Sequence, residues 1–113
     1  ASQQGYSHED YVAHTKMIIQ SVLATGEATL SVVANLLNLH PRQLQAELQQ
    51  RRSSFRQLLD EVRYSEAQLQ LSHSSISLTD LALGLGYADE TAFSRAFKRW
   101  SGLTPSQWRQ QAQ

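Results

Sequence analysis

Residues 78–103 read LTDLALGLGYADETAFSRAFKRWSGL, and this stretch decides the fold. Its first half has apolar residues at helical spacing between Ser77, a capping residue, and Gly86, which suits the positive φ that ends a helix. A second helix is expected to begin near Asp89, because apolar residues gather on one side of it and polar or basic residues on the other. Two helices joined by a tight turn, with a polar outer face on the second, predict a helix-turn-helix motif.

The same pattern occurs 48 positions earlier in the chain, which predicts an internal repeat. The matching positions, in order, are Thr29, Leu30, Val33, Ala34, Leu37, Asn38 and Leu39 with Ser77, Leu78, Leu81, Ala82, Leu85, Gly86 and Tyr87. Chance alignment of two amphipathic helix pairs would explain the leucines alone. The caps and the turn residues match as well, and Asn38 also tolerates a positive φ. A second helix is expected to follow this turn, with His40 and Pro41 at its start.

Three segments resemble the AraC/XylS family of bacterial transcription regulators. ADETAFSRAFKRWSGLTPSQWR is similar to the C-terminal signature of that family, and LNLHPRQLQAEL and SSFRQLLDEVR to its first helix-turn-helix and connecting helix. The resemblance covers roughly residues 28 to 110. It implies two helix-turn-helix subdomains joined by one long helix, with both recognition helices in successive major-groove segments of a double-stranded DNA operator. RNA polymerase is a further candidate partner, and the family's regulatory and dimerisation domain is expected to be absent from these residues.

The expected fold is all-α with about seven helices. Its parts are a disordered N-terminus (1–6), a first helix-turn-helix subdomain with a supporting N-terminal helix capped by Ser7 (7–54), a connecting helix (55–73) and a second helix-turn-helix subdomain (74–113). The connecting helix is apolar on two sides and is therefore expected to contact both subdomains. The residues behind this expectation are Phe55, Leu58, Leu59, Val62, Ala67, Leu69 and Leu71. With two readers, that is, two recognition helices, in one chain, we expect the protein to bind an asymmetric site as a monomer.

Candidate DNA contacts follow from the outer faces of the two second helices. The base-reading candidates are Arg42, Gln43, Gln45, Ala46, Glu90, Thr91, Ser94 and Arg95, and the phosphate candidates are Gln49, Arg51, Arg52, Lys98 and Arg99. Arg and Gln have the paired hydrogen-bonding geometry that reads guanine and adenine edges. Ala46 departs from the family, which often has arginine there, and its methyl group suits a thymine. Arg95 has an alternative partner in Asp89 or Glu90, and Arg63 is expected to form an ion pair with a carboxylate.

The formal net charge is zero, whereas DNA-binding domains are usually basic. Eight of the ten cations nevertheless lie in or near the proposed DNA-facing elements. Solvated helix faces would explain the same charges, so a helical protein-interaction module without DNA binding stays open as the alternative. DNA binding should weaken log-linearly with salt, whereas a hydrophobic helix-in-groove contact should barely respond.

Other functions find little support in the sequence. The chain has no cysteines, its four histidines lack metal-ligand spacing, and no serine has a recognisable base partner. We therefore expect neither an enzyme nor a metal or cofactor site. No apolar run is long enough for a membrane span, and a cytoplasmic location is expected.

Overall fold

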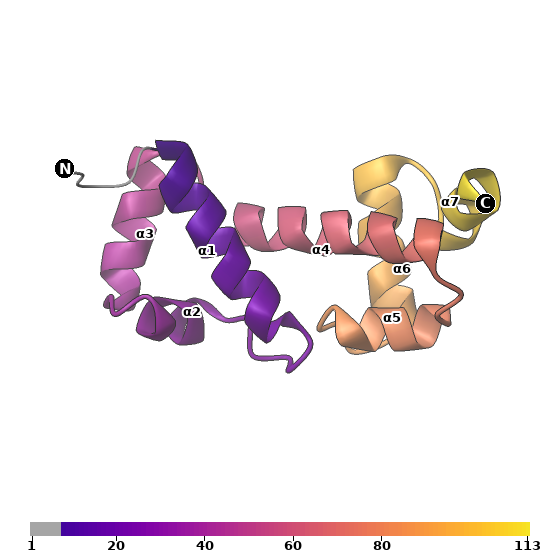
Figure 1. Ribbon diagram of the computed structural model, residues 1–113, viewed down its shortest axis with the longest axis horizontal. Helices are drawn as coiled ribbons and strands as arrows, with labels where there is room; N and C mark the ends of the chain where they lie inside the picture. The colour runs from indigo at the N-terminus through magenta and orange to yellow at the C-terminus, as the bar shows by residue number, and fades with distance from the viewer. Residues whose placement is uncertain (1–7) are drawn as a thin grey trace.

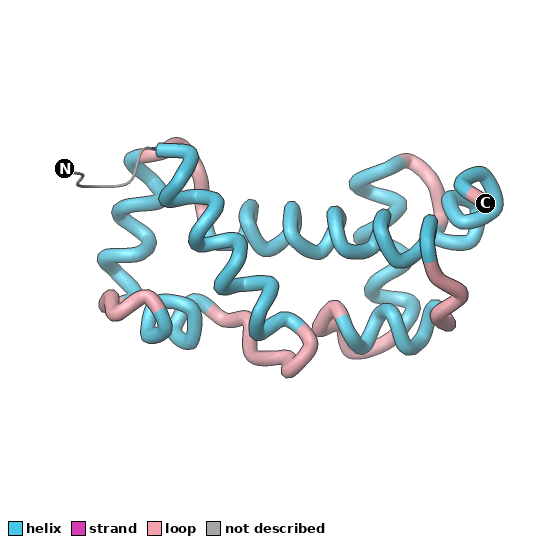
Figure 2. The backbone as a smooth tube through the Cα atoms, in the orientation of Figure 1, coloured by secondary structure: helices cyan, strands magenta, loops and turns pink. Residues whose placement is uncertain are grey.

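The computed structural model describes residues 8–113, which form seven helices and no strand. The helices are α1 (His8–Leu23), α2 (Leu30–Leu36), α3 (Pro41–Gln50), α4 (Phe55–His73), α5 (Leu78–Gly84), α6 (Glu90–Ser101) and α7 (Pro105–Ala112). Figure 2 shows how short the connecting loops are. The prediction of an all-α fold with about seven helices is confirmed. The predicted disorder of residues 1–6 and the cap at Ser7 lie outside the described residues.

The molecule is elongated, with extents of 47 × 25 × 21 Å, and α4 lies at its centre (Figure 1). In Figure 1, α1, α2 and α3 lie at one end of α4, and α5, α6 and α7 lie at the other. The 19 residues of α4 span about 28 Å at 1.5 Å per residue. A single helix thus carries two separate helix-turn-helix units.

Both halves of α4 are buried, as its wide apolar pattern predicts, because α4 packs on α1 with one half and on α7 with the other. Its buried residues are Leu58, Leu59, Val62, Ala67 and Leu71. Leu69 is an exception, since 53% of it is exposed. The expectation that Leu69 contacts a subdomain was therefore wrong, because this part of α4 has a free outer side.

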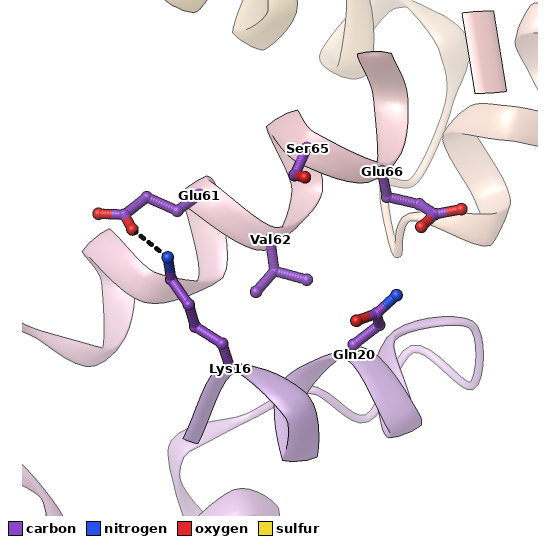
Figure 3. A pocket seen from close by; sticks show the side chains of 6 residues that line it. All are labelled: Lys16, Gln20, Glu61, Val62, Ser65 and Glu66. Carbon is purple, nitrogen blue, oxygen red and sulfur yellow. Dashed lines mark ion pairs between the residues drawn. The ribbon is translucent and has the colours of Figure 1, made fainter. Parts of the chain in front are cut away.

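An ion pair also fastens α1 to α4 beside the apolar contact. Lys16 Nζ lies 2.7 Å from Glu61 Oε1 across a small pocket of about 150 Å3 between the two helices (Figure 3). The hydrogen bond from Lys16 lowers the pKa of the Glu61 carboxyl below its ordinary value of 4.5. Both side chains are more than one third exposed, so we expect the pair to contribute less than about 1 kcal/mol.

The first lobe is formed by α1, α2 and α3 with the adjoining half of α4, and the second lobe by α5, α6 and α7 with the other half. The second lobe has an aromatic core. Phe93 and Phe97 are fully buried, and the Phe97 ring contacts the Trp108 ring edge-on with centroids 5.5 Å apart. The ring centroid of Tyr64, in α4, lies 5.6 Å from that of Phe97 and 5.5 Å from that of Trp100. These contacts show that the aromatic residues face inward, and they attach α6 and α7 to the second half of α4.

Candidate nucleic-acid interface

The two copies of the repeat begin with the same cap. Thr29 Oγ1 accepts a hydrogen bond from the backbone N of Val32 at 3.2 Å, and Ser77 Oγ accepts one from the backbone N of Asp80 at 3.0 Å. Both caps have extended backbone, so each side chain reaches the free N–H groups of its helix. The short helices α2 and α5 therefore begin with the same kind of N-terminal cap.

The turns that follow these helices are also alike. Leu37 has φ −91° and ψ 2°, and Leu85 has φ −91° and ψ −2°. The next residues, Asn38 and Gly86, have φ values of 60° and 90°. One residue further, backbone N–H groups donate back to Ala34 and Ala82 at 2.9 and 3.0 Å. The repeat predicted from the sequence is confirmed at the level of individual backbone bonds.

Each turn is followed by a recognition helix, α3 or α6, whose inner side is apolar. In α3, His40 is the cap, Pro41 stands at the first position and Leu44 and Leu48 are fully buried. In α6, the side chain of Asp89 accepts a hydrogen bond from the backbone N of Ala92 at 2.9 Å. The buried residues of α6 are Phe93, Ala96 and Phe97. Burial of these sides turns the opposite sides of both helices outward.

The outward sides hold most of the residues predicted to contact DNA. The exposed ones are Arg42, Gln43, Gln45, Ala46, Gln49, Arg52, Glu90, Thr91, Arg95, Lys98 and Arg99. Ser94 is half-buried. The exposed side chains form two groups, one on α3 and the segment after it and one on α6, at opposite ends of the molecule (Figure 1).

Arg51 differs from the other predicted phosphate contacts because its side chain is already engaged within the protein. Its Nη1 donates to the side chain and to the backbone carbonyl of Glu47, both at 2.8 Å. Its guanidinium also lies 4.1 Å from the ring centre of Tyr11, in α1. Burial raises the pKa of Tyr11, and the Glu47 carboxylate adds to the rise. Arg51 thus joins α3 to α1, and a phosphate contact would have to displace this arrangement.

Arg52 is held in a backbone conformation that an arginine rarely adopts. Its φ is 57°, and the following residue, Ser53, donates its backbone N–H to the carbonyl of Leu48 at 2.9 Å. This bond closes the end of α3 in a motif where glycine is the common choice. The strained residue two positions after the end of α3 is thus an exposed cation.

Arg95 forms an ion pair with neither of the carboxylates suggested for it, Asp89 and Glu90. Asp89 accepts the capping bond from Ala92, and the hydroxyl of Thr79 donates to Glu90 Oε1 at 3.3 Å. Among residues 8–113, the ion pairs found do not include Arg95. The exposed guanidinium of Arg95 therefore has no carboxylate to leave before it could contact a ligand.

Arg63 does not form the ion pair that the sequence suggested. Its Nε donates to the backbone carbonyl of Leu85 at 2.9 Å, and its guanidinium lies 4.4 Å from the ring centre of Tyr87. Burial raises the pKa of Tyr87, although the charge of Arg63 opposes the rise. The prediction was wrong because the carbonyl at the end of α5 lacks a helical partner and attracts the guanidinium instead. The side chain binds the second turn, a role that sequence reasoning missed.

The described residues contain no group of three or more His, Cys, Asp or Glu side chains that could hold a metal ion. None of their helices is both long and apolar enough to cross a membrane.

Comparison with known proteins gives the same class as the geometry, a helix-turn-helix protein. The sequence model of a family described as "Helix-turn-helix domain" matches residues 33–111. The HTH-type transcriptional regulator VirS of Mycobacterium tuberculosis is 32% identical over 92 residues, which cover 81% of this chain and 27% of that protein. The HTH-type transcriptional activator RhaR of Escherichia coli is 41% identical over 61 residues, or 54% of this chain and 22% of that protein.

Solved structures agree. The C-terminal domain of AraT, a response regulator from Geobacillus stearothermophilus, matches with a TM-score of 0.78 and 31% identity over 88% of this chain and 84% of that one. A DNA-binding transcriptional dual regulator from Escherichia coli K-12 shares the fold, with a TM-score of 0.83 and 24% identity over 99% of this chain and 97% of that one. The chain belongs to the AraC/XylS family of helix-turn-helix proteins. It spans about a quarter of the length of the curated relatives named above.

Proposed function

We propose that these residues form a sequence-specific double-stranded DNA-binding domain of a transcription regulator. The observation that carries the proposal is the pair of matching turns, each followed by a helix with an exposed polar face, at the two ends of a 47 Å molecule. Successive major-groove segments on one side of DNA are about 34 Å apart, which fits within this length. The two recognition helices would enter these segments together, and one chain would bind an asymmetric site as a monomer.

Specificity would come from the exposed middle of each recognition helix. Arg42, Gln43 and Gln45 are the candidates on α3 for hydrogen bonds with base edges, and Ala46 would contact a thymine methyl group. On α6, Arg95 is the strongest candidate because its guanidinium is exposed and is absent from the ion pairs among residues 8–113. The remaining base-reading candidates on α6 are Glu90, Thr91 and Ser94.

Phosphate contacts would position the domain. Arg52, Lys98 and Arg99 are exposed cations at or after the ends of the recognition helices, and Gln49 is an exposed neutral donor. Arg51 would join them only after releasing Glu47. If three cations each neutralise one phosphate, the slope of log affinity against log salt is about −2.7. This shallow slope would follow from the small number of cations that contact phosphates.

The comparisons support a wider proposal for the protein to which these residues belong. Because the aligned residues make up only 27% and 22% of these relatives, we propose that a regulatory and dimerisation domain accompanies this one and that RNA polymerase is a second partner. The domain itself would act by binding, without catalysis, in the cytoplasm.

Selection of bound sites from random DNA tests the central proposal. We expect an asymmetric motif to be enriched at moderate salt, and its absence with folded protein would refute DNA reading. Affinities of Arg95→Ala and Lys98→Ala for the selected and a scrambled site then separate the two contact types. Arg95→Ala should lose about 1–3 kcal/mol of preference, whereas Lys98→Ala should weaken both DNAs alike and reduce the salt slope by about 1. Equal losses on both DNAs for Arg95→Ala would contradict its base-reading role.

The same salt series tests the alternative of a protein-interaction module. Binding that is insensitive to salt and to DNA sequence, with affinity for an amphipathic helix instead, would favour that module over the DNA-binding proposal.

A further inference from the structure

The two lobes meet at the turn between α5 and α6. A small hollow of about 200 Å3 there is lined by residues of three elements, namely Gln20, Leu23 and Ala24 of or just after α1, Glu66 of α4 and Gly84 of α5. Figure 1 shows the lower end of α1 beside the end of α5. A Cβ atom on Gly86 would lie 3.6 Å from the backbone O of Leu23. The first lobe thus touches the turn that leads to the second recognition helix.

Arg63 fastens this turn to the middle of α4. Its Nε donates to Leu85 O at 2.9 Å and its guanidinium covers the ring of Tyr87, so it holds the residues on both sides of Gly86. α6 begins at Glu90, three residues after Tyr87. A contact that holds both flanks of so short a turn also restrains the direction in which α6 leaves it.

Gly86 shows that the approach of Arg63 is close. A Cβ atom at this residue would lie 3.1 Å from Arg63 Nη2, which is tighter than ordinary van der Waals contact. The equivalent residue of the first copy, Asn38, carries a side chain at a similar left-handed backbone and is exposed. Asn38 has φ 60°, within the range that asparagine tolerates, whereas Gly86 has φ 90°. The glycine at 86 also provides the space that the guanidinium of Arg63 occupies.

We propose that Arg63 is a positioning residue that sets the separation and relative rotation of α3 and α6, and thereby the half-site spacing that the domain accepts. This inference rests on the proposed DNA binding. Adding one base pair between the half-sites moves the second by about 3.4 Å and rotates it by about 35° around the DNA axis. Two readers held rigidly reject such a change, whereas readers joined only by α4 and its packing tolerate it by swivelling.

The first experiment measures affinity for the selected site and for versions with one base pair added or removed between its halves. We expect wild-type protein to lose at least about 10-fold on the altered sites, a preference of at least about 1.4 kcal/mol. Arg63→Met should reduce this ratio to less than about threefold. Arg63→Lys, which keeps a donor for Leu85 but lacks the flat guanidinium, should lie between the two.

Arg109→Met is the matched control. Arg109 also donates from Nε to a backbone carbonyl of another helix, that of Leu71, at 3.5 Å, but it does so at the far side of the second lobe. A merely structural loss should lower affinity for all spacings alike, and we expect this result for Arg109→Met. Arg63→Met with the wild-type spacing ratio would overturn the proposal.

A second measurement needs no DNA. The chain has no cysteine, so Ala13→Cys in α1 and Ser106→Cys in α7, both at exposed positions, allow spin labels on the two lobes. We expect a narrow distance distribution in the wild-type background and a broader one with Arg63→Met. An unchanged distribution would overturn the positioning role even if DNA binding fails in every assay. Broadening without any DNA preference would support the joint and refute the proposed function. If Arg63→Met does not fold, Arg63→Lys decides both measurements.

Discussion

Gly86→Ala should destabilise the fold much more than Asn38→Ala, although the two residues occupy equivalent turns. Alanine at φ 90° costs about 1–2 kcal/mol in backbone strain. Its Cβ would also stand 3.1 Å from Arg63 Nη2 and push on the guanidinium that binds Leu85. A charged hydrogen bond contributes about 1.5–3 kcal/mol, so its partial loss adds about 1 kcal/mol. The expected total for Gly86→Ala is about 2–3 kcal/mol.

Asn38→Ala lacks the second contribution, because Asn38 already carries a Cβ atom and is exposed. Its cost should be about 0.5–1 kcal/mol, since alanine tolerates the left-handed region less well than asparagine. Urea unfolding followed by circular dichroism reports both values because both lobes are helical, whereas Trp100 and Trp108 report only on the lobe that contains Gly86. In an Arg63→Met background the cost of Gly86→Ala should fall by about 1 kcal/mol. Equal costs for the two alanine variants would refute the reasoning.

Three further outcomes are expected. Arg52→Gly should stabilise the domain by about 0.5–1 kcal/mol in urea unfolding, because glycine has no penalty at φ 57°, while weakening DNA binding through the lost cation. Glu47→Gln should free Arg51 for a phosphate, so the magnitude of the salt slope should rise by about 0.9, and an unchanged slope would show that Arg51 stays on Tyr11. The Lys16 bond lowers the pKa of Glu61, so its stabilisation should be complete above about pH 4.5 and be lost as pH falls through the lowered pKa. Glu61→Gln should flatten this acid limb of an unfolding titration.

Local signals in the sequence were sufficient to predict the elements of this fold. Thr29, Ser77 and Asp89, which the sequence placed at helix starts, accept the expected backbone bonds, because each bond depends only on residues three positions apart. The internal repeat also predicted the two turns, because a residue that tolerates positive φ is needed after both Leu37 and Leu85. α4 runs from Phe55 to His73, the bounds expected for the connecting helix.

The partners of the arginines could not be predicted in this way. Arg51 stacks on Tyr11, which is 40 positions earlier, and Arg63 bonds to Leu85, 22 positions later. Which long cation is free depends on which distant ring or carbonyl lies within reach after folding, and helical periodicity carries no information about this. The one local signal was the contrast between Asn38 and Gly86, whose meaning became clear only with Arg63 beside the glycine.

The distribution of free cations predicts that the two readers act differently. On α3 and just after it, Glu47 engages Arg51, which leaves Arg42 and the strained Arg52 exposed among glutamines and Ala46. The outer side of α6 presents Arg95, Lys98 and Arg99. Lys98 and Arg99, in the last turn of α6, suit phosphate contacts that position the domain, whereas the glutamines and Ala46 of α3 suit short-range contacts with base edges. A rigid joint between the lobes makes this division useful, because the orientation fixed by the phosphate contacts of α6 presents α3 to only one register of the next groove.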